Sequence, residues 1–153
     1  MLAFARARLE TPSPRVALGM ALRGVATAAI DVSDGLLGDL GHILERSAVG
    51  ATVYADDAIE SIATYAHYKR ATGHFIINLS ASQWRALALA SGDDYELLFT
   101  APPERRGAVE AAALQSQTPV RRIGCIDTEP GVRVVDAQGQ LLPNTFASFD
   151  HFA

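Results

Sequence analysis

The chain has 153 residues, of which 49% are apolar and 20% are charged, and its formal net charge is −4. These values exclude a disordered chain and argue against a nucleic-acid-binding surface, and the length allows one sizeable core. A single cysteine excludes a disulfide framework or a cysteine metal cluster, and no apolar run reaches the roughly 18 residues needed to cross a bilayer. We therefore expect one soluble domain in a reducing cytoplasm, with no membrane or nucleic-acid partner.

Two prolines near the N-terminus mark the first boundary. Pro12 and Pro14 prevent a continuous helix there, so we interpret residues 1–13 as a linker or the remnant of an interdomain connection. Residues 14–153 then form the domain.

Within the domain, helical and strand patterns alternate. Apolar residues at three-and-four spacing predict helices over residues 14–26, 34 to at least 44, 58–68, 80–90 and 102–114. Short apolar or β-branched runs predict strands over residues 28–32, 50–55, 95–101, 119–126 and 131–136. The run 75–79 is ambiguous between a strand and an apolar lead into the helix that follows. This alternation predicts an α/β fold with a mixed sheet covered by helices.

Three features of this pattern have structural interpretations. Asp56 and Asp57 precede a helix, where carboxylates are favoured in any case, so we interpret them as capping residues. Trp84 is expected to anchor the core or an interface. Cys125 lies in an apparent strand and is expected to be a packed, inert thiol.

Asp31 and Asp34 form the most informative acidic pair. Asp31 ends a predicted strand, Asp34 falls in the first turn of a predicted helix, and the Ser33 hydroxyl is a natural N-cap between them. A helix start favours phosphate, whereas two carboxylates repel it unless a cation lies between them. The pattern is therefore compatible with Mg²⁺, which takes one or two carboxylates together with phosphate oxygens. The alternative is purely structural: capping by Ser33, dipole compensation by Asp34 and turn closure by Asp31.

Four sequence blocks stand out along the chain. They are TPSPRV at 11–16, AIDVSDGL at 29–36 followed by GDLGHIL, GDDYELLFT at 92–100 and FDHF at 149–152. In this order they resemble the blocks of thiamine-monophosphate kinases, and GDDYELLFT distinguishes these kinases from their superfamily relatives. The resemblance implies the fold of the C-terminal domain of aminoimidazole ribonucleotide synthetase.

The resemblance also implies roles for individual residues. Asp31 and Asp34 would hold Mg²⁺ on the nucleotide phosphates, and Ser33 would touch ATP. Asp93 stands where the family has a glutamate that contacts thiamine monophosphate, and Phe149 where it has an aromatic residue near the substrate's ring. The implied reaction transfers a phosphoryl group from ATP to thiamine monophosphate and gives thiamine diphosphate. Its acceptor is an already ionised phosphate oxygen, so no protein base is required.

In this family an N-terminal domain supplies the other metal ligands, most of the nucleotide site and the dimer interface. That domain is absent from these 153 residues, so we expect a half-site with negligible kinase turnover on its own. Two alternatives stay open: a non-catalytic module that binds a phosphorylated ligand or a partner, and another superfamily member such as a synthetase acting on a purine precursor.

Overall fold

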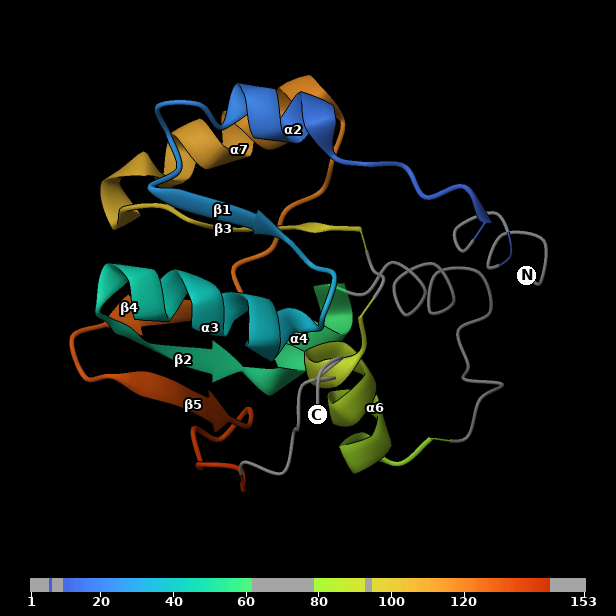
Figure 1. Ribbon diagram of the computed structural model, residues 1–153, viewed down its shortest axis with the longest axis vertical. Coiled ribbons are helices and arrows are strands. Elements are labelled where there is room, and N and C mark those ends of the chain that lie inside the picture. The colour runs from blue at the N-terminus through green and yellow to red at the C-terminus, as the bar shows by residue number, and fades with distance from the viewer. Residues whose placement is uncertain (1–5, 7–9, 62–78, 93–94, 144–153) are drawn as a thin grey trace.

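The computed structural model describes residues 6, 10–61, 79–92 and 95–143 (Figure 1). Their helices and strands alternate along the chain. In order they are α2 (Val16–Ala21), β1 (Ala28–Asp31), α3 (Leu36–Ser47), β2 (Gly50–Tyr54), α4 (Ala55–Ser61), α6 (Ala81–Ala90), β3 (Leu97–Thr100), the 3-10 helix η1 (Pro103–Arg105), α7 (Arg106–Ser116), β4 (Gly124–Asp127) and β5 (Gly131–Val135).

Strands β1 and β3 form an antiparallel pair in which Ala28 lies opposite Thr100 and Asp31 opposite Leu97. Side chains alternate between the two faces of a strand, and both faces of this pair are covered. Ile30 and Leu98 belong to the larger core cluster, whereas Leu97 and Phe99 pack against a second cluster around α2 and α7. The pair therefore lies between two helical layers.

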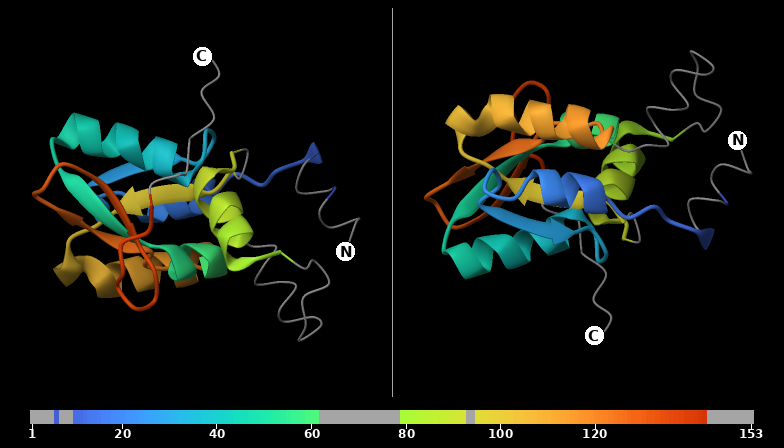
Figure 2. Two further views of the ribbon diagram at one scale, coloured as in Figure 1. Left: turned by 90° about the horizontal axis from the view of Figure 1, so that it is seen from below. Right: turned by 90° about the horizontal axis from the view of Figure 1, so that it is seen from above.

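The second sheet has the order β4-β2-β5. Strand β2 pairs antiparallel with β4 and parallel with β5, so the sheet is mixed, as the sequence predicted. Helices α3 and α6 contact each other, α3 also contacts strands of both sheets, and α2 packs along α7. Figures 1 and 2 show the β1–β3 pair between the α2–α7 layer and α3. The expected α/β class, a mixed sheet covered by helices, is confirmed.

Helix α6 shows how closely local chemistry can define an element. Its N-cap is Ser80, whose side chain accepts a hydrogen bond from the Gln83 N–H, while the Gln83 side chain accepts one from the Ser80 N–H. This capping box satisfies two donors that the helix start would otherwise leave unpaired. Trp84 packs against the core from this helix, as predicted.

Several predicted boundaries are wrong. The first helix ends at Ala21, well before residue 26, because Gly24 adopts a left-handed conformation with φ of +74° that breaks it. Helix α4 starts at Ala55, so Asp56 and Asp57 lie inside its first turn. Residues 75–78 of the ambiguous run lie outside the described residues.

The strand predicted over 119–126 starts late, at Gly124. Its partner β2 ends at Tyr54, where α4 begins, and therefore offers the segment 119–123 little to pair with. Cys125 is exposed, so the expectation of a packed thiol is wrong. The Tyr54 hydroxyl donates to its Sγ atom over 3.7 Å.

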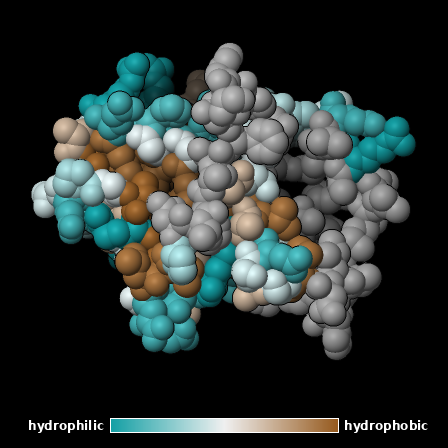
Figure 3. Space-filling view, turned by 60° about the horizontal axis from the view of Figure 1, so that its bottom comes forward, coloured by the Kyte–Doolittle hydropathy of each residue, from teal (hydrophilic) through white to brown (hydrophobic). Residues whose placement is uncertain are grey.

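Apolar side chains reach the surface in several places. Val16 and Met20 on α2 are 61% and 66% exposed, and Leu114 on α7 is 81% exposed. Apolar side chains also reach the surface on the face seen in Figure 3. In the part of the chain that the structure describes, no helix combines the length and apolarity that spanning a membrane requires.

Candidate functional site

Helix α3, which follows the loop after β1, starts later than predicted. The N-cap of α3 is Gly35, with φ of +104°, and no side chain caps this helix. A Cβ atom at Gly35 would lie 2.9 Å from the Ala90 carbonyl oxygen, so glycine is required by both conformation and space. Ser33 therefore does not cap α3, and Asp34 precedes the helix rather than lying in its first turn.

Asp39 binds the backbone of the loop that precedes α3. Its Oδ2 atom accepts hydrogen bonds from the backbone N–H of Ser33, at 2.9 Å, and from that of Asp34, at 3.1 Å. Its own N–H donates to the Gly35 carbonyl at 3.0 Å. Two N–H groups that a phosphate could have used are thus occupied by a carboxylate inside the protein. This loop is consequently suited to a cation more than to a bare anion.

Asp34, Asp39 and His42 form a cluster at the start of α3. Each offers one potential ligand atom, and these atoms lie within 4.8 Å of one another. Asp34 is half-buried, Asp39 is only 2% exposed and His42 is exposed. The pattern of the helix could have revealed Asp39, because it is a charged residue inside the apolar stripe formed by Leu36, Leu40 and Ile43.

Asp31 lies close in sequence but outside this three-residue cluster. It ends β1, as predicted, and its side chain is exposed. By strand alternation it shares a face with its cross-strand partner Leu97, towards α2, whereas α3 packs on the face of Ile30. The structure therefore groups Asp34 with Asp39 rather than with Asp31.

The backbone of the GDDYELLFT block, residues 92–100, contacts the loop that follows β1. The Val32 N–H donates to the Glu96 carbonyl at 2.9 Å, and the Tyr95 N–H donates to the Val32 carbonyl at 3.2 Å. A Cβ atom at Gly92 would overlap the carbonyl oxygen of Ser33, so only glycine allows this approach. Blocks some sixty residues apart in sequence thus form one loop cluster.

The TPSPRV block, residues 11–16, is connected to the GDDYELLFT block by an ion pair. The Arg15 guanidinium donates to both carboxylate oxygens of Glu96, at 2.8 and 2.7 Å. This bidentate hydrogen bonding raises the pKa of Arg15 above its ordinary value. The segment that enters α2 is thereby fixed to the start of β3.

Two predicted substrate-binding residues, Asp93 and Phe149, lie outside the described residues. Their assignment remains a prediction. The described residues Gly92 and Tyr95 both approach the loop that carries Val32 and Ser33.

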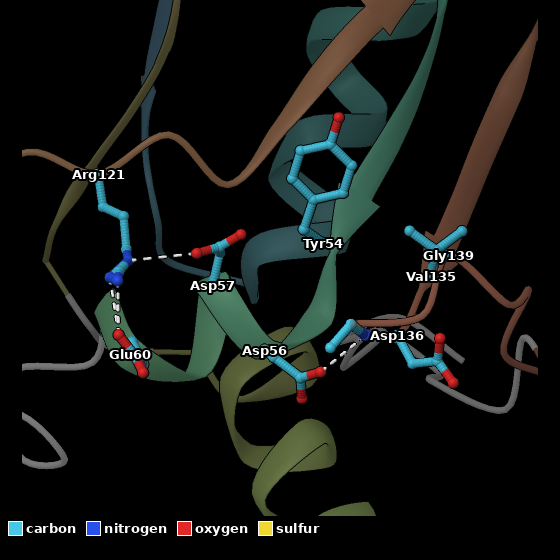
Figure 4. Close-up of a pocket in the computed structure, with 9 residues that line it drawn as sticks. Tyr54, Asp56, Asp57, Glu60, Arg121, Val135, Asp136 and Gly139 are labelled. Atoms are coloured by element: carbon cyan, nitrogen blue, oxygen red, sulfur yellow. Dashed lines mark hydrogen bonds and ion pairs between the residues drawn. The ribbon is translucent and has the colours of Figure 1, made fainter.

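A separate pocket of about 430 Å³ lies where β2 meets α4 (Figure 4). Its acidic side chains already have partners: Arg121 forms ion pairs with Asp57 and Glu60, and Asp56 accepts from the Ala137 N–H at 2.9 Å. Asp31, Ser33 and Asp34, the predicted site residues that the structure describes, do not line this pocket. We interpret its charges as a structural ion network.

Comparison with known proteins identifies close relatives. The family model described as AIR synthase related protein, C-terminal domain, matches residues 5–137. The thiamine-monophosphate kinase of Salmonella typhimurium is 39% identical over 143 residues, which are 93% of this chain and 40% of that protein.

Solved structures agree with this result. The crystal structure of thiamine-monophosphate kinase from Stenotrophomonas maltophilia K279a superposes with a TM-score of 0.71 and 45% identity, covering 84% of this chain and 37% of that one. The structure of AaThiL complexed with AMPPCP and TMP gives a TM-score of 0.62 and 26% identity over 89% of this chain and 38% of that one.

The chain spans about two fifths of the length of the curated relatives it matches. Those relatives are thiamine-monophosphate kinases, as the sequence blocks predicted, and the family model covers most of the chain. The chain therefore belongs to the AIR synthase related protein, C-terminal domain family.

Proposed function

We propose that this chain is the C-terminal part of an ATP-dependent kinase that phosphorylates thiamine monophosphate to thiamine diphosphate. The observation that carries the proposal is the meeting of two sequence blocks, in which Gly92 lies directly against the Ser33 carbonyl. The acidic loop of the first block and the substrate-binding segment of the second then share one site. Relatives at 39% identity are thiamine-monophosphate kinases, and a structural neighbour is complexed with AMPPCP and TMP.

Asp31 and Asp34 are the residues we assign to Mg²⁺. Carboxylate oxygens are the ligands that this ion prefers, and potential ligand atoms of Asp39 and His42 lie within 4.8 Å of that of Asp34. When bound, Mg²⁺ would neutralise charge on the transferring phosphate. The donor set of Asp34, Asp39 and His42 fits such an ion, whereas the assignment of Asp31 rests on the sequence blocks.

The remaining assignments concern the two substrates. The exposed Ser33 lies on the same loop as the metal-binding carboxylates, where we assign it to ATP. Asp93 and Phe149 are assigned to thiamine monophosphate. The protein residues orient the acceptor phosphate in line with the leaving group, which is most of what phosphoryl transfer requires from a protein.

The other half of the site belongs to an N-terminal domain in this proposal, which also forms the family dimer. Exposed apolar side chains such as Val16, Met20 and Leu114 are expected of a surface that another domain or subunit covers. We place the working enzyme in the cytoplasm, and we expect negligible kinase turnover from these 153 residues alone.

A chimera tests the proposal. Residues 14–153 would replace the matching portion of the Stenotrophomonas maltophilia kinase, and ADP release would be measured with ATP, Mg²⁺ and thiamine monophosphate. We expect turnover from the chimera, and a loss of about 100-fold or more in Asp31→Asn and Asp34→Asn, since each removes charge stabilisation from the transition state. Asp57→Asn, which removes the same charge in the separate pocket, is the matched control.

Two outcomes would contradict these assignments. A folded chimera that binds ATP but leaves thiamine monophosphate unphosphorylated would favour the non-catalytic module, or the synthetase if a purine precursor were turned over instead. Unchanged Mg²⁺ dependence in both aspartate variants would refute the metal assignment.

A further inference from the structure

Asp39 is a charged side chain in an apolar position. It is 2% exposed and lies on the face of α3 that carries Leu36, Leu40 and Ile43 into the core. Burying a carboxylate is costly, and an apolar residue at this position would pack with less penalty. The position therefore calls for an explanation beyond helix packing.

The contacts of Asp39 provide one. Its Oδ2 atom accepts from two successive backbone N–H groups, those of Ser33 and Asp34, at 2.9 and 3.1 Å. On the other side of the same loop, Gly92 lies against the Ser33 carbonyl oxygen. The peptide that precedes Asp34 is consequently held from both sides.

We infer that Asp39 is a positioning residue that fixes the Ser33–Asp34 backbone so that the Asp34 carboxylate is presented to a divalent cation. The inference rests on the proposed function for the identity of the cation, and it adds a residue to which the sequence blocks gave no role. Asp39 acts through its Oδ2 atom, which accepts from both N–H groups, and direct ligation by Asp39 is the alternative that the experiment distinguishes.

Positioning and direct ligation give different results in two variants. Asp39→Asn keeps a side-chain oxygen that can accept both N–H groups but removes the charge that a metal ligand would need. Asp39→Ala removes the acceptor altogether. Glu45, exposed on the same helix, gives the matched controls Glu45→Gln and Glu45→Ala.

The experiment is amide hydrogen exchange by NMR on the full 153-residue chain, followed by titration with Mn²⁺ as the probe. In the unaltered chain the Ser33 and Asp34 amides should be protected. We expect Asp39→Ala to speed their exchange and to weaken Mn²⁺ binding at least tenfold, whereas Asp39→Asn stays within about threefold of the original for both. Signals from β2 and α6 report whether each variant is folded.

Each result supports or overturns the inference. Unprotected amides in the unaltered chain, or protection that Asp39→Ala leaves unchanged, would overturn it. Equal losses of Mn²⁺ affinity in Asp39→Asn and Asp39→Ala would overturn it in favour of a direct ligand. If Asp39→Ala does not fold, the unaltered chain and Asp39→Asn still decide. Absence of Mn²⁺ broadening near Asp34 in the unaltered chain would count against the proposed metal site, while the exchange data would still decide the role of Asp39.

Discussion

Arg15 and Glu96 are 81 positions apart and form a bidentate ion pair that fixes the entry of α2 to the start of β3. Their side chains are 25% and 35% exposed, so water screens this pair less than a surface pair. A double-mutant cycle with Arg15→Ala and Glu96→Ala should give a coupling free energy of about 1 kcal/mol. The measurement is urea denaturation of the single and double variants.

The surface pair Arg6–Glu10, with side chains 77% and 57% exposed, is the matched control for that cycle. We expect its coupling to be about 0.3–0.5 kcal/mol and to fade with salt. The raised pKa of Arg15 keeps its guanidinium charged at alkaline pH, so the coupling of Arg15 with Glu96 should survive as the pH rises to about 10. Equal coupling in the two pairs would show that partial burial adds nothing.

Gly92→Ala tests the contact between the two acidic blocks. The new Cβ atom would overlap the Ser33 carbonyl oxygen, so the loops must separate, and we expect a loss of about 1–3 kcal/mol in the free energy of unfolding. Gly107→Ala on α7 meets nothing within 4 Å and should stabilise the chain by about 0.5–1 kcal/mol. Thermal denaturation of both variants would measure the difference, and a neutral Gly92→Ala would refute the close approach.

Tyr95 adopts a left-handed backbone conformation with φ of +53° shortly before β3. A residue with a Cβ atom is strained there, and glycine is not. Tyr95→Gly should therefore unfold with a free energy about 1 kcal/mol higher than Tyr95→Ala, since both variants lose the same ring. The ring is 44% exposed, so its removal should cost little by itself. Indistinguishable denaturation midpoints would contradict the strained conformation.

The Tyr54 hydroxyl titrates under the influence of Cys125. Its hydrogen bond to the Cys125 Sγ atom, followed by charge repulsion from that sulfur, raises the pKa of Tyr54. A raised pKa means that the folded state holds the proton more tightly. The resulting stability is therefore complete below the pKa of an unfolded tyrosine, about 10, and is lost as the pH rises through the folded-state value.

Cys125→Ala removes both causes and should lower the pKa of Tyr54 towards its ordinary value. Phenolate absorbance across an alkaline titration measures this, with Tyr54→Phe to identify the signal among the four tyrosines of the chain. A titration curve that Cys125→Ala leaves in place would show that the sulfur does not influence Tyr54.

Local signals in the sequence predicted much of the fold. The apolar run that became β1 and the Ser80 cap of α6 each carry their information within a few residues, and both elements were placed within one residue of their observed starts. The strand over 119–123 failed because strand formation depends on a partner, and β2 reaches only as far as Ile123, whose carbonyl accepts from the Tyr54 N–H. The local spacing of apolar residues does not indicate whether a strand partner distant in sequence is present.

Residues of the site could be predicted from the sequence, but the hydrogen bonds and close contacts among them could not. Asp31 at the end of β1 follows from the apolar run before it, whereas the capping role given to Ser33 was wrong because α3 starts at Leu36 with Gly35 as its N-cap. The approach of Gly92 to Ser33 depends on the pairing of β1 with β3. The glycine at position 92 could have suggested a close backbone contact, but not that the contact is with Ser33.

The pairing of β1 with β3 also has a consequence for how the protein folds. Its register joins positions separated by 66 to 72 residues, from Asp31–Leu97 to Ala28–Thr100. Closing so long a loop costs chain entropy before any of the ladder's hydrogen bonds are gained. The ribosome must therefore release residue 100 before the pairing of β1 with β3 is complete, so the loop from Val32 to Gly35 is expected to acquire its neighbours late, after the helices have formed.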